Sequence, residues 1–570
     1  MSNFYSDNAD LVAQLERLDL ARVVGLREHE YKLAHDYTYS PTDLDDALDS
    51  YRRTLEIVGD IAGEFVAPRS EDVDRDGSQL VDGEVVYAPG ISAALERLRQ
   101  ADLMGITLPR RYGGLNFPIA VSIMVIEIVS RADAALMNVF GLQEIAETIN
   151  KFASEEIKQE FLPRFASGEV TGSMALTEPE AGSDLQNVQF KATLDKDGVW
   201  RLSGVKRFIT NGCGQVSLVL ARSEEGTTDA RGLSMFVYER DEHMRIRRLE
   251  DKFGIHGSPT CELEFSDAPA RLVGERRRGL TTYVMSLMNG ARLAIAGQAQ
   301  GIAEAAYRAA YKYAGERVQF GGPIKDLTAV AGILADMKVS IEASRALLYE
   351  TALIVDMKED LERLAERDPE QAKDLRGEIK KYTRLAALFT PLCKACATEM
   401  ANKVTYDSIQ VHGGSGYMRD FAVERHARDA RITNIYEGTT QLQVVAAIGG
   451  VLGGTLAERL DEYDAGDLSA TPDLHEHLRA ARAQLAAATA HVRAVDEARF
   501  RDYHAHRLVN MATDIVCAYL MLRDAQHEAR KLLAARHFID GVMTRATAAS
   551  LVVLGSDPGV LDNLAVLGAD

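Results

Sequence analysis

The chain has 570 residues, 46% of them hydrophobic and 26% charged, a balance typical of globular proteins with large cores. This length predicts roughly two to five domains of about 100–200 residues each. With 65 Lys and Arg against 85 Asp and Glu, the net charge of -20 argues against broad binding of nucleic acid or anionic membranes.

The first part of the chain has helical periodicity. Residues 1–50 form an acidic extension, in which LVAQLERLDLARVVGL predicts one amphipathic helix. From Ser40 a second helix is expected, opened by a cap-like Ser-Pro, and residues 51–170 continue as an N-terminal α domain.

The pattern changes over residues 171–285. Short segments such as VQFKATL, SLVLARS and CELEFSD alternate polar and apolar residues and are separated by turns such as DKDG. This period of two predicts a middle β domain with a mostly antiparallel sheet.

Helical periodicity returns in residues 286–454, which predict a C-terminal four-helix bundle. The charge-dense stretch from Asp356 to Arg384 is expected to extend two antiparallel helices into solvent or to connect them. Residues 455–570 predict an extra helical domain with an acidic excess. Helices, strands and helices in blocks indicate an α+β fold, mostly α, and not an alternating βαβ fold.

Cysteine use and the first residues bear on location. Five cysteines cannot build a disulfide scaffold, so a reducing compartment is expected. The polar start MSNFYSDNAD does not resemble a secretory or transit signal, and the apolar stretch 444–457 is too short for a bilayer. We expect a cytoplasmic protein with no transmembrane segment. Cys393 and Cys396 are expected to be packed thiols, and no metal site is expected.

Three motifs could carry chemistry, although each has an ordinary alternative. HGGSGY (412–417) is a Gly-rich turn but not a dinucleotide fingerprint or a Walker loop. TEPEAGSD (177–184) allows close backbone approach to a ligand or is a simple turn. IYEGTTQLQ (435–443) starts an apolar helix, with a Thr as its cap, and holds a lone Glu437.

The order of five motifs is more specific than any one of them. TEPEAGSD, RFITNG (207–212), RVQFGGPI (317–324), QVHGGSGY (410–417) and IYEGTTQLQ together resemble the acyl-CoA dehydrogenase family. The resemblance covers about residues 51–450. The outer segments resemble those of larger members, which carry an added C-terminal helical domain.

The resemblance implies FAD bound between subunits and oxidation of an acyl-CoA thioester to the trans-2-enoyl-CoA. Glu437 is implied as the base that removes the α-proton, while the β-hydrogen leaves as hydride to flavin N5. Burial would strengthen this carboxylate as a base. Some members carry the base on the first bundle helix, where this chain has Ala291.

The resemblance also implies the binding residues. Those for FAD are Leu176, Thr177, Ser183, Phe208, Thr210, Arg317, Gln319, Phe320, Gln410, Gly413, Gly414, Thr439 and Gln441. Those for the substrate are Ser183, Asn289, Arg292 and Gly438. Asn289, Thr328, Val444 and Gly449 depart from the family pattern, and Arg276–Arg278 either meet the CoA 3′-phosphate or form a solvated loop.

The implied partners are an acyl-CoA, an electron-transferring flavoprotein and a second copy of the chain, in a homodimer or a tetramer. Alternatives are an acyl-CoA oxidase that uses oxygen, a flavin-containing binding protein of the DNA-associated kind, and an inactive paralogue. The acidic tail argues against the DNA-associated protein, and Glu437 argues against the paralogue. The sequence does not indicate the acyl group.

Overall fold

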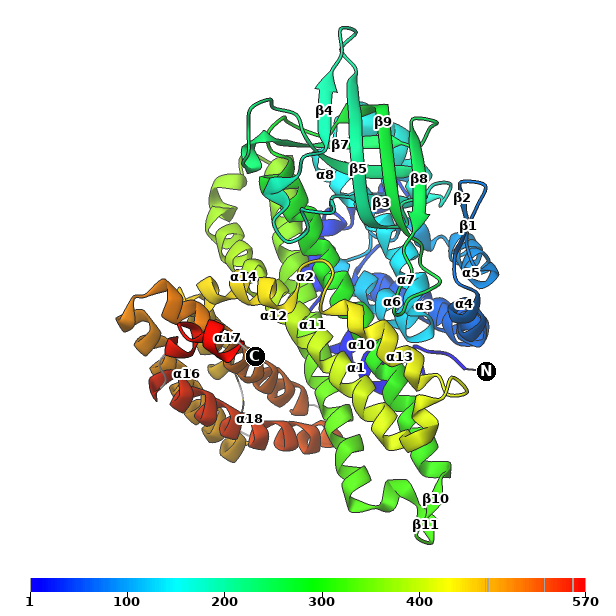
Figure 1. The fold of residues 1–570 in the computed structure, drawn as a ribbon. Coiled ribbons are helices and arrows are strands. Elements are labelled where there is room, and N and C mark those ends of the chain that lie inside the picture. Colours follow the sequence, from blue (N-terminus) through cyan, green and yellow to red (C-terminus); the bar gives the residue numbers. More distant parts are fainter. Residues whose placement is uncertain (1, 467, 469–470, 527, 556–557, 569–570) are drawn as a thin grey trace.

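The computed structural model describes residues 2–466, 468, 471–526, 528–555 and 558–568. A β domain lies at one end of the molecule, with N-terminal helices beside it and long bundle helices running away from it (Figure 1). The last helices form a separate group against the side of the bundle. This arrangement confirms the predicted α+β, mostly α fold with an extra C-terminal helical domain.

The N-terminal extension holds two helices where the sequence analysis predicted one. Helix α1 (Ala9–Arg17) ends at Leu18, whose backbone is extended, and α2 (Ala21–Arg27) begins after Leu20. The break lets Val23 pack against Met357 and Leu361 of the bundle. Helix α3 (Leu44–Asp60) begins at Asp43, whose carboxylate accepts a hydrogen bond from the Asp46 amide at 2.9 Å, so Asp43 rather than Ser40 is the cap.

The N-terminal α domain continues in short helices and one hairpin. The helices are α4 (Ser70–Asp76), α5 (Pro89–Gln100), α6 (Ile119–Ala132), α7 (Ala134–Phe140), α8 (Ile145–Phe152) and α9 (Glu155–Ala166). Strands β1 (Gln79–Val81) and β2 (Glu84–Val86) pair in a region predicted as helical. Asp82 and Gly83 form the hairpin turn with φ of 53° and 85°, and an Asp-Gly turn between apolar segments is a hairpin signal.

Seven strands form the middle domain. They are β3 (Gly172–Ala175), β4 (Lys191–Leu194), β5 (Trp200–Thr210), β6 (Val216–Arg222), β7 (Leu233–Glu239), β8 (Met244–Leu249) and β9 (Thr260–Leu272). The order is β3-β6-β4-β5-β9-β7, β8 pairs with β9, and a β6–β7 pairing closes the ring. Only β3–β6 and β4–β6 are parallel among the pairings of the described strands, so the mostly antiparallel prediction is confirmed.

The bundle is built from three long helices and two shorter ones. They are α10 (Met285–Glu316), α11 (Thr328–Arg367), α12 (Ala372–His412), α13 (Val423–Thr433) and α14 (Thr440–Leu452). A small hairpin of β10 (Val318–Gln319) and β11 (Gly322–Pro323) joins α10 to α11 at the end of the bundle away from the sheet (Figure 1).

The charge-dense stretch connects α11 to α12 but is not all in solvent. Asp356 and Asp360 of α11 are buried and bind the buried guanidinium of Arg27 at 3.2 and 3.1 Å. Asp356 also accepts the amides of Ile119 and Ala120, the first residues of α6. The N-terminal extension therefore covers this part of the bundle, which the sequence analysis did not anticipate.

The C-terminal helices are α15 (Thr455–Asp464), α16 (Pro472–Val495), α17 (Ala498–Ala525), α18 (Ala529–Gly555) and α19 (Leu564–Leu567). Buried ion pairs join them to the rest: Lys531 of α18 binds Asp10 of α1, and binds Glu342 of α11 at 2.7 Å. Asp10 also binds Arg345 at 2.6 Å. Among the described helices, α18 alone is long and apolar enough by itself to cross a bilayer; it packs on α16 and α17.

Candidate active site

Glu437 lies in the short turn between α13 and α14, in an unusual backbone conformation. Its φ is 53° and that of Gly438 is 90°. Few non-glycine residues adopt a positive φ, and surrounding contacts must hold them there. The turn ends at Thr439, which caps α14 by accepting a hydrogen bond from the Leu442 amide at 3.4 Å.

Two buried side chains hold this turn. The Nζ atom of Lys394, on α12, donates to the carbonyl oxygens of Tyr436 and Gly438 at 2.9 and 2.7 Å. The Nε2 atom of Gln443 donates to the same Gly438 oxygen at 2.9 Å. The carbonyl oxygens on either side of Glu437 are therefore fixed by side chains of neighbouring helices.

The electrostatics around Glu437 balance burial against two cations. Burial raises the pKa of its carboxyl, while the positive charges of Lys394 and Arg292 lower it. Burial also lowers the pKa of Lys394 to about 7 and lowers that of Arg292. A carboxylate in this setting is a stronger base than one in water, yet the cations favour its ionised form.

The Glu437 side chain lines a small pocket between the helices and the sheet. The pocket has a volume of about 50 Å³. Its walls are mainly apolar and come from Met137, Asn138, Gly141, Leu142, Glu144, Ile145, Met174, Thr210, Leu287, Ala291, Ala294, Ile295, Tyr436 and Glu437. Pockets of this kind, apolar with a few polar groups, are typical of sites for small molecules.

A hydrogen-bonded group forms one wall of the pocket. Gln298 donates to the carbonyl oxygen of Ala134 at 2.9 Å and to Oδ1 of Asn138 at 2.8 Å. The Tyr436 hydroxyl donates to Gln298, and lies 3.2 Å from the same Asn138 oxygen. The Nδ2 atom of Asn138 is buried and has no hydrogen-bond partner in the described part of the chain.

A larger cavity adjoins the pocket. Its volume is about 1080 Å³, and Gly141, Glu144 and Leu287 line both spaces. Its walls combine the start of α10, including Asn289, with residues of α8, α11 and the N-terminal extension. Asn289 accepts a hydrogen bond from Arg292 at 3.2 Å, which links the two residues expected at the substrate.

Several residues expected at the flavin lie at the end of the sheet nearest this pocket. Leu176 and Thr177 follow β3, and Thr210 ends β5 and lines the pocket. Phe208, also on β5, has a φ of 60° and is half exposed, and the Arg207 guanidinium lies 4.6 Å from the centre of its ring. Ser183 is exposed on the following loop.

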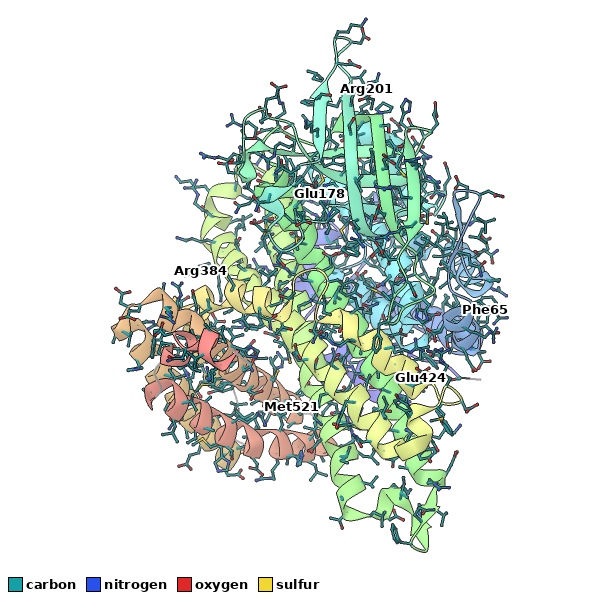
Figure 2. All side chains as sticks on the ribbon, in the orientation of Figure 1. Phe65, Glu178, Arg201, Arg384, Glu424 and Met521 are labelled. Atoms are coloured by element: carbon teal, nitrogen blue, oxygen red, sulfur yellow. The ribbon has the colours of Figure 1, made fainter. Side chains whose placement is uncertain are left out.

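A buried ion pair organises the loop after β3. Lys206 is fully buried, and its Nζ lies 2.9 Å from Glu178 and 2.8 Å from the Leu176 carbonyl oxygen. Glu178 also accepts the amides of Gln189 and Phe190. Figure 2 shows Glu178 where the sheet meets the helices. This pair fixes the loop that carries Thr177.

The other residues expected to bind the flavin nucleotide lie far from the Glu437 pocket of the same chain. Arg317 follows α10, and from Arg292 to Arg317 the helix rises roughly 38 Å at about 1.5 Å per residue. The residues at this far end are Arg317, Gln319, Phe320, Gln410, Gly413 and Gly414. Phe320 is 94% exposed, and a Cβ built on Gly413 or Gly414 would meet no atom within 4 Å. Thr439 and Gln441 lie with Glu437 and not with this group.

Both groups fit FAD chemically. The far group presents an exposed guanidinium, an amide and open glycine backbone without a carboxylate, which suits a diphosphate. The near group presents hydroxyls, backbone and an aromatic face beside an apolar pocket, which suits a flavin ring. Because the groups lie at opposite ends of α10, one FAD molecule cannot contact both within one chain.

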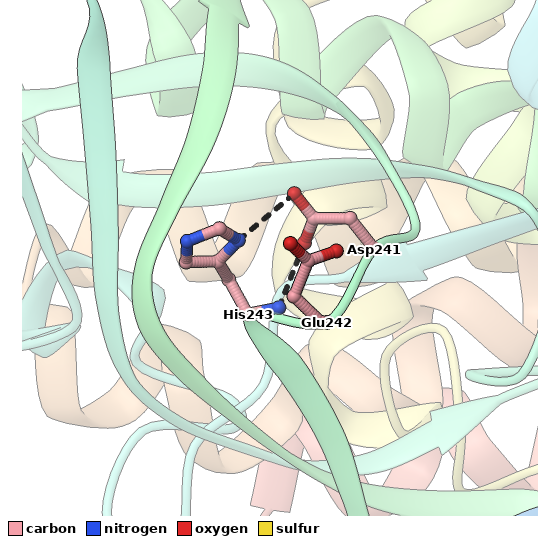
Figure 3. Close-up of side chains that lie close together, drawn as sticks. All are labelled: Asp241, Glu242 and His243. Carbon is pink, nitrogen blue, oxygen red and sulfur yellow. Dashed lines mark hydrogen bonds and ion pairs between the residues drawn. The ribbon is translucent and has the colours of Figure 1, made fainter.

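Two other clusters are explained by local contacts. Arg276 pairs with Glu224 and Arg278 with Glu275, both at 2.9 Å. Asp241, Glu242 and His243 gather at the turn before β8, where His243 lies 3.1 Å from Asp241 (Figure 3). The Tyr238 hydroxyl also donates to Asp241 at 2.6 Å. These hydrogen bonds account for the second cluster, which is partly exposed.

Comparison with known proteins agrees with this geometry. Four family models match consecutive parts of the chain: the acyl-CoA dehydrogenase N-terminal domain (49–169), middle domain (173–268) and C-terminal domain (278–448), and the acyl-CoA dehydrogenase C terminal (453–538). The chain belongs to the acyl-CoA dehydrogenase family. It is an oxidoreductase of the longer kind, with the extra C-terminal domain.

Individual relatives share most of their length with this acyl-CoA dehydrogenase. The 3-methylmercaptopropionyl-CoA dehydrogenase of Ruegeria pomeroyi is 34% identical over 80% of both chains. The butyryl-CoA dehydrogenase structure from Megasphaera elsdenii is 31% identical, covering 71% of this chain and 98% of its own, with a TM-score of 0.62. The Bacillus anthracis acyl-CoA dehydrogenase, complexed with FAD, shares the fold over 91% of this chain and 90% of its own at 24% identity, with a TM-score of 0.74.

The residues around the Glu437 turn and the adjoining pocket were only partly found from sequence. Lys394, Gln443, Lys206, Asn138 and Glu144 were missed. A lysine at an inward position of the alternating strand WRLSGVKRFIT is a signal that could have identified Lys206. No local sequence pattern identifies Lys394, Gln443, Asn138 or Glu144, because the residues that they contact lie on other elements or several positions away along the chain.

Proposed function

We propose that this enzyme oxidises an acyl-CoA thioester to the trans-2-enoyl-CoA, with Glu437 as the base. The observation that carries the proposal is the position of the Glu437 carboxylate in the wall of a small apolar pocket beside Thr210 and Ala291. An α-proton of a thioester is weakly acidic, so its removal needs a desolvated base and hydrogen bonds to the carbonyl oxygen.

Each protein group has a part in the proposed reaction. The backbone N–H of Glu437 binds the thioester oxygen, and the fixed turn holds this donor in place. The Glu437 carboxylate takes the α-proton, and the apolar walls exclude water from it. Lys394 and Arg292 keep the carboxylate ionised before the reaction.

FAD, when bound, supplies the acceptor for the β-hydrogen, which leaves with two electrons as a hydride. We propose that Leu176, Thr177, Phe208, Thr210 and Ser183 hold the flavin side. The diphosphate and adenosine would be held by the far group of a second copy, Arg317, Gln319, Phe320, Gln410, Gly413 and Gly414. Thr439 and Gln441 are proposed to contact the flavin nucleotide bound across that interface.

The division of the flavin residues supports a homodimer or a larger assembly of dimers. We propose that the electrons then pass to an electron-transferring flavoprotein and that the enzyme acts in the cytoplasm. Rapid reoxidation of the reduced enzyme by oxygen would instead indicate an acyl-CoA oxidase.

An anaerobic titration tests the proposal. The purified protein, with its flavin, is mixed with acyl-CoAs of increasing length, and the flavin absorbance is followed. Bleaching by a saturated thioester, absent in the Glu437→Gln variant, is the expected result. Bound flavin that no thioester bleaches would overturn the proposed reaction.

A further inference from the structure

A second carboxylate lies in the catalytic pocket and takes no part in the proposed reaction. Glu144 precedes α8 and lines the same small pocket as Glu437, at the point where the pocket meets the larger cavity. The Glu437 charge is one of the causes that raise the pKa of Glu144. Within the part of the chain that the structure describes, the Glu144 carboxyl makes no hydrogen bond or ion pair.

The opposite wall leaves space for this carboxyl. Gly290 of α10 faces Glu144, and a Cβ at residue 290 would lie 2.7 Å from the Glu144 Oε1 atom. Any side chain on Gly290 would therefore displace the carboxyl. The glycine lets Glu144 reach the pocket beside α10.

Asn138 lines the same pocket and carries a buried amide NH₂. Asn138 is 5% exposed, and its Oδ1 atom accepts from Gln298. The Tyr436 hydroxyl, which donates to Gln298, lies 3.2 Å from the same oxygen. Gln298 fixes the amide orientation, because a flipped Asn138 would set its NH₂ against the Gln298 NH₂, whose own orientation is fixed by the Ala134 carbonyl oxygen. The Nδ2 atom of Asn138 is then left without a partner among the residues that the structure describes.

The protonation state of Glu144 decides whether a hydrogen-bond acceptor or a donor on the ligand can bind between Glu144 and Asn138. Burial and the neighbouring Glu147 and Glu437 raise the pKa of Glu144 to about 8. At neutral pH its carboxyl is then mostly protonated and has an O–H to donate. Glu144 and Asn138 thus offer two hydrogen-bond donors in the pocket that Glu437 also lines. A negatively charged acyl end would be repelled by the Glu437 carboxylate.

A plain alkyl group in this pocket would bury both donors without partners. The loss for one unpaired buried polar group corresponds to about a 5- to 100-fold change in affinity or rate. An acyl group with an ether, hydroxyl or carbonyl oxygen would satisfy them. An alkyl group of equal length would not.

We propose that Glu144, together with Asn138, makes this enzyme select acyl-CoA thioesters whose acyl group carries an uncharged hydrogen-bond acceptor beyond the β-carbon. The proposal rests on the proposed function, because it assigns the acyl end of the substrate to the pocket of Glu437. Glu144 is the specificity residue, and Glu437 remains the base.

Matched pairs of thioesters test the selection. 3-Methoxypropionyl-CoA is compared with pentanoyl-CoA, and 4-methoxybutyryl-CoA with hexanoyl-CoA, since each pair differs by one oxygen in place of a methylene. In the wild-type enzyme we expect kcat/KM for at least one ether to exceed that for its alkyl partner by about 5- to 100-fold.

Four variants locate the cause. Glu144→Leu should abolish or reverse the preference, and Glu144→Gln, which retains a donor, should keep it. Gly290→Ala should weaken it by displacing the carboxyl, which gives a second route if Glu144→Leu does not fold. Glu156→Gln, exposed on α9 and outside both cavities, should leave every value unchanged.

A binding measurement separates this proposal from the reaction itself. In the Glu437→Gln background, the dissociation constants of the same four thioesters are measured by the perturbation of the flavin spectrum, with and without Glu144→Leu. A preference for the alkyl partners, or an ether preference that survives Glu144→Leu, would overturn the role of Glu144. If none of the thioesters binds or bleaches the flavin, the proposed function itself fails.

Discussion

The Nζ atom of Lys394 lies 2.7 Å from the carbonyl oxygen of Gly438, 44 residues further along the chain. The lysine belongs to α12 and the glycine to the turn that carries Glu437. The position of the proposed base therefore depends on α12 as well as on α14, the flanking helix that carries Gln443. This dependence makes the properties of Glu437 sensitive to changes at residue 394.

The first prediction concerns Glu437 itself. Glu437→Gln removes the base but keeps the shape and the backbone of the turn, so FAD should be retained. Turnover should fall by about 10²–10⁴-fold, the usual contribution of a general base. Flavin absorbance of the purified variant and kcat with the preferred thioester measure the two effects. A near-normal kcat in the variant would show that Glu437 is not the base.

The second prediction concerns pH. Glu437 must be ionised to accept a proton, so kcat/KM should fall as the pH drops through its pKa, which burial places above 4.5. Lys394→Met removes a charge that lowers this pKa, and the acidic limb of the pH profile should move to higher pH. Lys394→Arg keeps the charge and should move it less. An unchanged limb in Lys394→Met would contradict the coupling.

The third prediction concerns the network that joins the two ends of the chain. Asp10→Asn would leave Arg345 and Lys531 buried with one partner fewer, and should lower the free energy of unfolding by about 3–5 kcal/mol. Asp49→Asn, in an exposed pair with Arg53, should change it by less than about 1 kcal/mol. Urea unfolding followed by circular dichroism compares the two, and equal effects would refute the importance of the network.

The same network predicts acid sensitivity. Arg345 and Lys531 hold the pKa of Asp10 well below its usual range. At a second contact between α11 and the C-terminal helices, Arg523 and Arg459 lower the pKa of the buried Glu350 to about 2. A depressed folded-state pKa contributes stability above the unfolded value of about 4, and this stability is lost as the pH falls below it. The thermal midpoint should drop between about pH 5 and pH 2, and Asp10→Asn should show a smaller drop than the wild type.

The fourth prediction concerns the far group. Arg317→Ala should weaken FAD retention, because the guanidinium is proposed to bind the diphosphate of the flavin in a second copy. The flavin-to-protein absorbance ratio after gel filtration measures retention, and Arg53→Ala on α3 serves as a surface control. Full occupancy in Arg317→Ala, with an unchanged thermal midpoint, would argue against this contact.

The fold was largely predictable because its signals are local. Alternation of polar and apolar residues in segments such as CELEFSD marked the β domain, and long apolar periodicity marked the bundle. The hairpin β1–β2 was not predicted although Asp82-Gly83 is a turn signal, because each strand has only three residues and both lie between helical segments. The break between α1 and α2 could not be seen, because it depends on Val23 packing against a helix more than 300 residues away.

The candidate site was predictable only where a motif carries it. Glu437 and Arg317 stand in recognisable motifs, whereas Glu144 stands in a short turn of 3-10 helix, Gly141–Glu144, that no motif marks. Its place in the pocket depends on the close approach of α10 at Gly290. Lys394 likewise stands between two cysteines in an Ala-rich helix, and only the folded chain brings it to the turn.

The Asp10–Lys531 contact has a consequence for how the molecule is made. The two residues are 521 positions apart in the sequence. At a synthesis rate of about 5–20 residues per second, α1 emerges roughly 25–100 seconds before the helix that carries its lysine partner. During that interval Asp10 has no Lys531 to pair with. The first helix of the nascent chain therefore completes its native contacts only after nearly all of the polypeptide has been translated.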